Sequence, residues 1–426
     1  MKILVVGGGG REHALCWALH RDIPGATLYA APGNPGTAAL AENLSIPATD
    51  VARIVSAVEH QRIDLTVVGP EAPLAAGLVD ALRVHGRHVF GPTRSAAELE
   101  WSKAFAKDVM ETAGVPTAQS ETFARLDQAL AYIDRHAEPL VVKASGLAAG
   151  KGVIVCGTRA EAQQAARAML ADGAFGKAGE EIVVEDFLAG EELSVLALTD
   201  GTRTMILPPA QDHKRLLDGD SGPNTGGMGA YCPVSVATDA LIARVRRQVF
   251  EPILNEMEER GTPYHGVLYA GLMLAPDGTP NILEFNCRFG DPETQAILPV
   301  VPGIMREVAG IAAGGWTPPT PVLAAERAAV TTVLAARGYP DHPAQGAEIR
   351  IPTDLGPDVL VFHAGTAGTA GALRVSGGRV LAVTGLAQSV GQAAERSRAA
   401  CARITFEGRQ YRQDIGWREI ARAGAA

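Results

Sequence analysis

The N-terminal stretch of the chain favours an open α/β fold. Residues 3–6 are apolar and predict a buried strand, residues 7–10 are all glycine, and residues 11–20 predict a helix. A strand, a glycine loop and a helix also begin a dinucleotide-binding unit, but the third glycine position of that fingerprint holds Glu12. The next strand, near residues 26–30, ends without an acid for a ribose, which disfavours NAD or FAD. A helix behind a glycine loop can still hold another phosphate.

The alternation of strands and helices continues through the first hundred residues. Residues 64–68 predict a strand that ends in Gly-Pro and Glu71. Ligands of open parallel sheets bind at the carboxyl ends of the strands, so Glu71 is a candidate acceptor for a sugar hydroxyl. A capping or surface role for Glu71 is an equally good interpretation. We expect this first domain to close near Lys103.

Length and composition narrow the class of protein. A chain of 426 residues is too long for one core, so several domains are expected. The net charge of −9 argues against a nucleic-acid or anionic-membrane surface, but not against anionic small molecules. The five cysteines are scattered and form no C-x-x-C pair, which disfavours structural zinc and disulfides and fits a reducing cytoplasm. We find no signal peptide and no apolar run of membrane-spanning length, and we expect a cytoplasmic protein without membrane partners.

The middle of the chain carries a glycine-rich hairpin. Residues 140–144 predict a strand that contains Lys143, residues 153–155 predict a second strand, and Gly150 and Lys151 lie between them. Backbone N–H groups and a lysine in such a turn suit the cover of a triphosphate. The hairpin is not a P-loop, because its G-x-x-x-G-K-G spacing is one residue short and no Ser or Thr follows. A plain glycine-rich hairpin is the alternative.

A second stretch suited to a nucleotide follows this hairpin. A predicted strand ends at Glu185, and an apolar linker with Phe187 and Leu188 comes next. The backbone of the linker could hold an adenine, and Glu191 or Glu192 just beyond it could hold a ribose. Glutamate pairs are usually only solvated, so this stretch is weak by itself.

A long polar loop lies near the centre of the sequence. Residues 211–215 (QDHKR) are polar and basic, and residues 219–229 (GDSGPNTGGMG) are rich in glycine. Loops of this kind are usually functional or disordered, and Lys214 just before the loop favours function. A helix over residues 239–260 and an apolar strand over residues 266–274 are predicted next.

Residues 282–286 (ILEFN) predict a short strand with polar groups on one side. Side chains alternate along a strand, so Glu284, Asn286 and Arg288 can project the same way. The carboxylate and amide oxygens suit Mg²⁺ shared with phosphates, and the guanidinium can fork onto a carboxylate. Asp291 is then predicted to cap a helix whose first residue is proline. The alternative is a core strand whose polar ends are only solvated.

The C-terminal part has the size of one small domain. A proline-rich stretch at residues 317–321 predicts a linker. Strands are predicted at residues 329–335, 359–363 and 373–383, the last of them around a Gly-Gly turn. A helix over residues 389–404 completes this β-rich region.

Seven stretches carry a resemblance to a known family. They are GGREHAL (9–15), APGNPGT (31–37), VGPEAPL (68–74), KASGLAAGKGV (143–153), QDHKR with GPNTGGMGAY (211–215 and 222–231), LYAGLM (268–273) and EFNCRFGDPETQ (284–295). On these motifs the chain resembles the phosphoribosylamine–glycine ligases, also called glycinamide ribonucleotide synthetases, of the ATP-grasp superfamily. The resemblance covers essentially the whole chain, and QDHKR, GPNTGGMGAY and NCRFGDPET together are highly specific.

The resemblance implies a multidomain α/β and α+β fold. Residues 1–103 would form a parallel-sheet domain like a truncated dinucleotide-binding fold. Residues 104–325 would form an ATP-grasp module with a mobile lid at about 123–192, and residues 326–426 a β-rich domain. The implied reaction joins glycine to 5-phosphoribosylamine with ATP, giving glycinamide ribonucleotide, ADP and phosphate. The partners would be these small molecules and Mg²⁺ or Mn²⁺, and the chain would act as a monomer or a small homo-oligomer.

The resemblance also implies site residues by position. Those expected to bind ATP are Lys103, Lys143, Gly150, Lys151, Glu185, Phe187, Leu188, Glu191 and Glu192. Glu284 and Asn286 are expected to bind the metal. Many relatives in the superfamily place another acid on the preceding strand, but residues 267–275 contain none, so the metal site here is expected to be poor in carboxylates.

For the substrates we advance hypotheses from the chemistry. Arg288 orients the glycine carboxylate, Asp291 or Glu293 receives its ammonium, and residues 219–229 with the hairpin exclude water. The Gly7–Gly10 loop with Arg11 is one candidate site for the substrate phosphate, and C-terminal basic residues are the competing one. The predicted substrate-binding residues are Gly9, Arg11, Glu71, Asp212, Asn224, Thr225, Gly226, Gly227, Arg288, Asp291 and Glu293, with Arg288, Lys214 and Asp291 as catalytic residues.

Three rival functions are weighed against this one. An ATP-grasp ligase with a different amine acceptor is disfavoured by the GPNTGGMGAY and NCRFGDPET motifs. A regulator that only binds nucleotide is disfavoured by the intact set of Glu284, Asn286 and Arg288. An NAD-dependent oxidoreductase is disfavoured by the incomplete N-terminal fingerprint.

Overall fold

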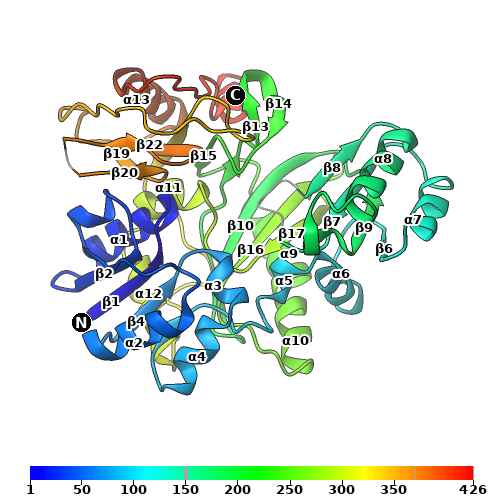
Figure 1. The fold of residues 1–426 in the computed structure, drawn as a ribbon, viewed down its shortest axis with the longest axis horizontal. Helices are drawn as coiled ribbons and strands as arrows, with labels where there is room; N and C mark the ends of the chain where they lie inside the picture. Colours follow the sequence, from blue (N-terminus) through cyan, green and yellow to red (C-terminus); the bar gives the residue numbers. More distant parts are fainter. Residues whose placement is uncertain (148–151, 370, 426) are drawn as a thin grey trace.

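The computed structural model of the protein describes residues 1–147, 152–369 and 371–425. It has an N-terminal α/β domain, a central ATP-grasp body with a lid that projects to one side, and a C-terminal sheet (Figure 1). The predicted fold class is therefore confirmed. The turn residues 148–151 of the predicted hairpin, including Gly150 and Lys151, lie outside the described residues.

The N-terminal domain is a five-stranded parallel sheet in the order β3-β2-β1-β4-β5. Its strands are β1 (Lys2–Gly7), β2 (Thr27–Pro32), β3 (Glu42–Asn43), β4 (Leu65–Val68) and β5 (Val89–Phe90). Its helices are α1 (Gly10–Asp22), α2 (Val51–Gln61), α3 (Glu71–Ala75) and α4 (Leu78–Val84), with the 3-10 turn η1 (Thr37–Ala39). The predicted strand, glycine loop and helix at the N-terminus are confirmed, and Glu71 begins α3 at the carboxyl end of β4.

The lid has an apolar core of its own. Its antiparallel sheet, in the order β6-β9-β7-β8, is covered by two helices. The elements are β6 (Ser120–Phe123), α7 (Leu126–Ile133), β7 (Leu140–Ala144), β8 (Val153–Cys156), α8 (Arg159–Leu170), η2 (Gly176–Gly179) and β9 (Ile182–Asp186). Because this buried cluster draws only on residues 123–184, the lid can shift without opening another core.

The ATP-grasp body is a four-stranded antiparallel sheet in the order β11-β10-β16-β17. Its strands are β10 (Glu191–Thr199), β11 (Thr204–Ile206), β16 (Gly266–Leu274) and β17 (Pro280–Asn286). The helical segments are α5 (Glu98–Trp101), α6 (Lys103–Thr112), α9 (Asp239–Val245), α10 (Glu251–Glu259), α11 (Glu293–Ile297), η5 (Leu298–Val300) and α12 (Ile304–Ala313). The helix predicted over residues 239–260 is interrupted, because Arg246–Phe250 form a π-helical segment between α9 and α10.

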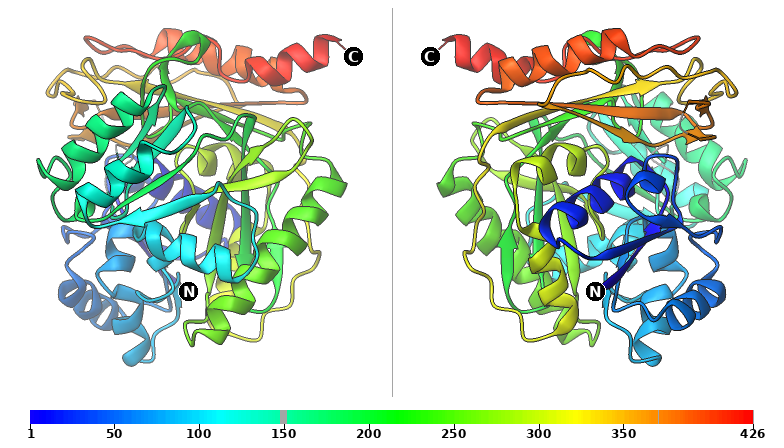
Figure 2. Two further views of the ribbon diagram at one scale, coloured as in Figure 1. Left: turned by 90° about the vertical axis from the view of Figure 1, so that its right-hand side faces the viewer. Right: turned by 90° about the vertical axis from the view of Figure 1, so that its left-hand side faces the viewer.

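The C-terminal sheet combines strands from two regions of the chain. Its order is β12-β15-β18-β22-β19, with β12 (Gln211–Asp212), β15 (Gly229–Cys232), β18 (Ala328–Ala335), β19 (Val359–His363) and β22 (Arg379–Ala387). Helices α13 (Val390–Arg403) and α14 (Trp417–Ala425) lie over its outer side (Figure 2). The proposed boundary at residue 325 stays a prediction, but the sheet takes β12 and β15 from before it.

One prediction about a loop was wrong. The loop predicted at residues 219–229 is largely built into a hairpin of β13 (Arg215–Leu217), η3 (Asp218–Asp220) and β14 (Ser221–Asn224), followed by β15. The strands predicted on either side of the Gly-Gly turn in residues 373–383 are present. Strand β21 (Arg374–Val375) pairs with β20 (Thr366–Ala367), while β22 enters the main sheet.

Among the described residues, no single helix has the length and apolar character needed to cross a membrane. One pair of helices, 293–300 and 304–313, meets that test only together and is bent by 102°.

Candidate active site

A cavity of about 890 Å³ lies where the lid, the body and the two terminal domains meet. Most of the predicted site residues line it: Arg11, Glu71, Lys103, Lys143, Glu185, Phe187, Leu188, Glu191, Glu192, Asp212, Lys214, Asn224, Thr225, Gly226, Glu284, Asn286, Arg288, Asp291 and Glu293. Gly9 and Gly227 are described but are not among the lining residues. The cavity therefore brings together segments that are up to several hundred positions apart.

The lid side of the cavity holds a buried cluster of opposite charges. Glu185 of β9 forms ion pairs with Lys143 of β7 and with Lys107 of α6, the latter at 2.7 Å. Lys143 Nζ also donates to the carbonyl of Leu283 at 3.0 Å. Burial lowers the pKa of Lys103, which also lines this side, while nearby Glu284 opposes that change. These lysines are fixed cations, as binding of a polyphosphate requires.

The two candidate ribose acids have different partners in the structure. Glu192 pairs with Lys214 at 2.8 Å. Glu191 accepts from the Nε2 atom of Gln211 at 2.5 Å and pairs with Arg422 of α14. Adjacent residues of a strand point to opposite faces, so one carboxylate turns toward the interior lysine and the other toward the C-terminal helix.

Acids and a lysine crowd the centre of the cavity. Burial raises the pKa of Asp212 to about 8, with Lys214 acting in the opposite direction. Burial disfavours the charged form of Lys214, but Glu192 and Asp212 together hold its pKa above the usual range. Burial also opposes ionisation of Glu284, yet Lys214 and Lys143 hold its pKa below the usual range. Glu284 thus stays an anion at neutral pH.

The candidate metal ligands end strand β17. Glu284 and Asn286 line the cavity beside Arg288, whose Nη2 atom donates to the Asn286 amide oxygen at 2.9 Å. Among the described residues, no group of three His, Cys, Asp or Glu side chains could hold a metal by itself. Two oxygen donors next to the lysines predicted to bind phosphate fit Mg²⁺, which commonly takes one or two protein ligands and completes its shell with nucleotide oxygens and water.

Arg288 is held by more groups than the sequence indicated. Its Nη2 atom lies 3.0 Å from Glu100 Oε1, and its Nε atom lies 3.4 Å from Glu71 Oε2. The Nη1 atom donates to the carbonyl of Phe289 at 3.3 Å. Sequence analysis missed Glu100, because no motif marks it and its only local cue is its place three positions before Lys103.

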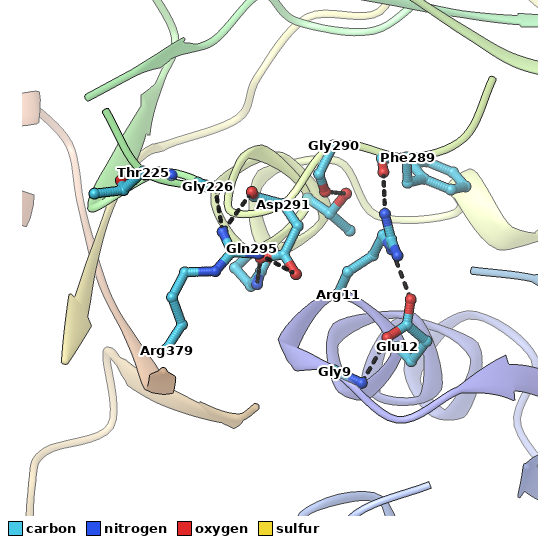
Figure 3. Close-up of polar contacts among 12 residues, drawn as sticks. Gly9, Arg11, Glu12, Thr225, Gly226, Phe289, Gly290, Asp291, Gln295 and Arg379 are labelled. Carbon is cyan, nitrogen blue, oxygen red and sulfur yellow. Dashed lines mark hydrogen bonds and ion pairs between the residues drawn. The ribbon is translucent and has the colours of Figure 1, made fainter. Parts of the chain in front are cut away.

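The Asp291 turn does not start a helix in the predicted way. Helix α11 begins at Glu293 with Pro292 before it, and no side chain caps it. The Asp291 carboxylate pairs with Arg379 of β22 at 3.2 Å and accepts from Gln295 at 2.8 Å (Figure 3). The sequence analysis missed Arg379. Its ion pair with the Asp291 carboxylate takes the place of the capping role that was predicted for Asp291.

A side chain of helix α1, Glu12, hydrogen-bonds to the Gly7–Gly10 loop that precedes the helix. Glu12 accepts from the Gly9 backbone N–H at 2.6 Å and from Arg11 Nε at 2.6 Å (Figure 3). Arg11 Nη1 donates to the carbonyl of Phe289 at 3.0 Å. The side chain of Glu12 therefore takes the place at the helix N-terminus that a bound phosphate would need.

The β13–β14 hairpin is anchored by the C-terminal segment. Arg412, which is only 1% exposed, donates to Asp220 at 2.8 Å and to Asp414 at 2.7 Å. Beyond the hairpin, Thr225 accepts from the Gly227 N–H at 3.0 Å. Gly227 has a φ of +105°, and a Cβ there would lie 2.5 Å from Pro292, so only glycine fits at this close approach.

Comparison with known proteins decides the family. Three sequence profiles match the chain in succession: the N domain of phosphoribosylglycinamide synthetase over residues 1–100, its ATP-grasp (A) domain over 101–294 and its C domain over 329–418. The chain belongs to the phosphoribosylamine–glycine ligase family. The resemblance inferred from the sequence motifs is thereby confirmed.

Relatives in this family match along the full chain. A phosphoribosylamine–glycine ligase from Ralstonia nicotianae is 50% identical over 99% of this chain and 100% of its own length. The human trifunctional purine biosynthetic protein adenosine-3 is 46% identical over 99% of this chain, which spans 42% of that protein. A crystal structure of the Thermotoga maritima ligase has a TM-score of 0.87 at 35% identity, covering 97% of this chain and 100% of that one.

A more distant structural likeness supports the fold alone. The biotin carboxylase domain of Hydrogenobacter thermophilus 2-oxoglutarate carboxylase, in complex with MgADP, has a TM-score of 0.74 at 17% identity. The alignment covers 96% of this chain and 91% of that domain.

Proposed function

We propose that this protein catalyses the ATP-dependent ligation of glycine to 5-phosphoribosylamine, giving glycinamide ribonucleotide, ADP and phosphate. The observation that carries the proposal is the single cavity in which Lys103 and Lys143 stand beside Glu284, Asn286 and Arg288. Membership of the phosphoribosylamine–glycine ligase family supports it. An ATP-grasp ligase with another amine acceptor is the alternative.

The chemistry proceeds through glycyl phosphate. A carboxylate is a poor electrophile, and phosphorylation by ATP gives it a leaving group that an amine can displace. This transfer depends on alignment and charge stabilisation rather than on acid–base catalysis. Lys103 and Lys143 supply fixed positive charge for the phosphates. Mg²⁺ or Mn²⁺ at Glu284 and Asn286 would neutralise further phosphate charge.

The cavity offers candidate residues for both charged groups of the substrate glycine, its carboxylate and its ammonium. Arg288 is proposed to orient the carboxylate. Of the two candidates for the ammonium, Glu293 is the better, because its Oε1 atom faces the neutral hydroxyls of Tyr269 and Ser194 at 3.1 and 3.4 Å. Asp291 is already neutralised by Arg379.

For the substrate phosphate we favour the C-terminal basic residues over the glycine loop. The Gly9 N–H and the Arg11 guanidinium are engaged by Glu12. Arg379 and Arg418 line the cavity from the C-terminal domain and are paired with Asp291 and Asp220. Neither pair caps a helix, so a phosphate could reach these two cations without opening a helix N-terminus. This assignment adopts the competing site that the sequence left open.

Water exclusion falls to the lid in this proposal. Glycyl phosphate hydrolyses readily, so the site must close around it. The β13–β14 hairpin is already fixed by Arg412, whereas the β7–β8 hairpin belongs to a lid with its own core. We therefore expect hydrogen-exchange protection to rise in the lid with nucleotide and glycine, and to change little in residues 215–224.

The deciding assay is ADP release with ATP and Mg²⁺, with glycine and freshly generated 5-phosphoribosylamine added separately and together. Turnover that needs both supports the proposal, and ADP release indifferent to glycine refutes it. The variant Arg288→Lys tests the role of the guanidinium, because a point charge cannot reproduce its fork. Unchanged kcat and glycine KM in that variant would remove Arg288 from its assigned role.

A further inference from the structure

We infer that Glu100 is a positioning residue for this reaction: it holds the guanidinium of Arg288 in the place where the glycine carboxylate binds. The inference rests on the proposed function, since it concerns the same site. Glu100 lies in the short helix α5, immediately before the α6 helix that begins with Lys103. Its side chain lines the cavity beside the end of β17.

The two carboxylate oxygens of Glu100 contact two consecutive residues, Arg288 and Cys287, just after the end of β17. Oε1 lies 3.0 Å from Arg288 Nη2, and Oε2 accepts from the backbone N–H of Cys287 at 2.7 Å. The same Nη2 atom donates to the candidate metal ligand Asn286 at 2.9 Å. Glu100 therefore gives Arg288 its shorter carboxylate contact and ties the guanidinium to the backbone of the preceding residue.

A comparison of the two acids on Arg288 separates their roles. The Glu100 side chain is 7% exposed and its contact is 3.0 Å, whereas the Glu71 side chain is 35% exposed and its contact is 3.4 Å. Charge-assisted hydrogen bonds are strongest when short and desolvated. Glu71 is thus the partner that an incoming carboxylate can replace at the Nε edge of Arg288, while Glu100 stays in place.

Charge balance explains why the pair can remain buried. Burial raises the pKa of the Glu100 carboxyl, and Arg288 acts against that rise. Burial acts to lower the pKa of Arg288, but Glu100, its nearer carboxylate at 3.0 Å, helps to hold that pKa above its usual value. Removing the carboxylate leaves a buried guanidinium without its best partner, which is costly. Arg288 would then turn to Glu71 and away from Asn286.

The test is Glu100→Gln, which keeps the size and an oxygen acceptor but removes the charge. The matched control is Glu98→Gln on the same helix, at a residue outside the cavity lining. We expect the glycine KM of Glu100→Gln to rise roughly tenfold or more, about 1.4 kcal/mol, with the ATP KM within about twofold. Glu98→Gln should leave both unchanged. Equal rises in the two KM values for Glu100→Gln would mean a general structural defect and overturn the inference.

A double-mutant cycle with Arg288→Lys gives the second readout. If Glu100 acts through Arg288, the double variant should lose no more kcat/KM for glycine than Arg288→Lys alone. Fully additive losses would show that Glu100 acts independently and would refute the positioning role.

The inference and the proposed function fail in different ways. Absence of glycine-dependent ADP release in the unaltered protein would refute the proposed function, whatever the results for the variants. The position of Arg288 needs no turnover to be measured: a crystal structure of Glu100→Gln should show the guanidinium moved from Asn286 toward Glu71. An unmoved Arg288 in that structure would overturn the inference while leaving the function standing.

Discussion

Replacing His13 by asparagine should remove the acid sensitivity of a contact between the first and last domains. His13 lies on α1, and its Nδ1 atom accepts from the backbone N–H of His363 on β19 at 2.8 Å. The ring packs edge-on against Phe362, with 5.6 Å between centroids. Gly36 packs closely on the ring, since a Cβ there would lie 2.3 Å from it. A proton on Nδ1 must therefore break the contact.

The size of the effect follows from the pKa shift. Burial, with His363 adding a smaller share, lowers the pKa of His13 from 6.5 to about 3. The folded state then binds fewer protons than the unfolded chain between these values, so its stability is full above pH 6.5 and falls as the pH drops toward 3. Each pH unit in this window costs up to about 1.4 kcal/mol, so His13 alone costs about 2 kcal/mol near pH 5.

Urea unfolding at neutral pH and near pH 5 measures the contribution of His13 to the free energy of unfolding. Trp17 lies on the same helix, with 6.1 Å between its ring centroid and that of Phe362, so it provides a fluorescence probe at the contact. In His13→Asn the Asn amide oxygen can still accept from the His363 N–H but does not titrate. The other histidines contribute equally to both proteins, so the acid-induced loss of stability should be about 2 kcal/mol smaller in the variant.

Equal acid-induced losses in the two proteins would refute the reasoning, because His13 would then not be a neutral acceptor in the fold. The exposed residue His60 provides the control. His60→Asn should follow the unaltered protein at both pH values.

Three further predictions test other contacts. Arg412→Met leaves Asp220 and Asp414 without their buried cation, so we expect a loss of about 3–5 kcal/mol and faster proteolysis in the hairpin. Lys143→Met removes a charge that we propose to bind phosphate, and ATP affinity by calorimetry should fall roughly 10–100-fold. Glu192→Gln should raise the ATP KM more than Glu191→Gln, because Glu192 faces Lys214 inside the cavity; the opposite order would place the ribose at Glu191.

Elements with strong local patterns were predictable from the sequence. The apolar strand predicted over residues 266–274 is β16 with the same bounds. The helix predicted over residues 389–404 is α13 (Val390–Arg403), and Ser389 caps it by accepting from the Gln392 N–H. In both cases the residues that decide the element lie within it or next to it, so periodicity and capping chemistry suffice.

Failures occurred where distant contacts override local preference. Asp291 followed by proline is a good local start for a helix, yet its carboxylate pairs with Arg379. Arg379 also donates to the Asp291 carbonyl, and the two residues are 88 positions apart. Glu100 contacts Cys287 across 187 positions. No local pattern contains such pairs, and only the folded chain makes them.

Motif residues and the side chains that support them differ in how visible they are in the sequence. The motifs contain many of the groups that face the cavity, such as Lys143, Glu284 and Arg288. The side chains that fix their neighbours, Glu100 and Arg412, lie in segments without a recognisable motif.

The C-terminal domain belongs to this supporting structure. Its sheet includes β12, which carries Asp212, and β15, which directly follows the Gly226–Gly227 approach to the Asp291 turn. Arg379 of the same sheet bonds the backbone of both Gly226 and Asp291 (Figure 3). The domain therefore cannot separate from the body without moving residues of the cavity. In this chain the C-terminal domain forms one wall of the site, and substitutions in it should alter substrate KM values as well as stability.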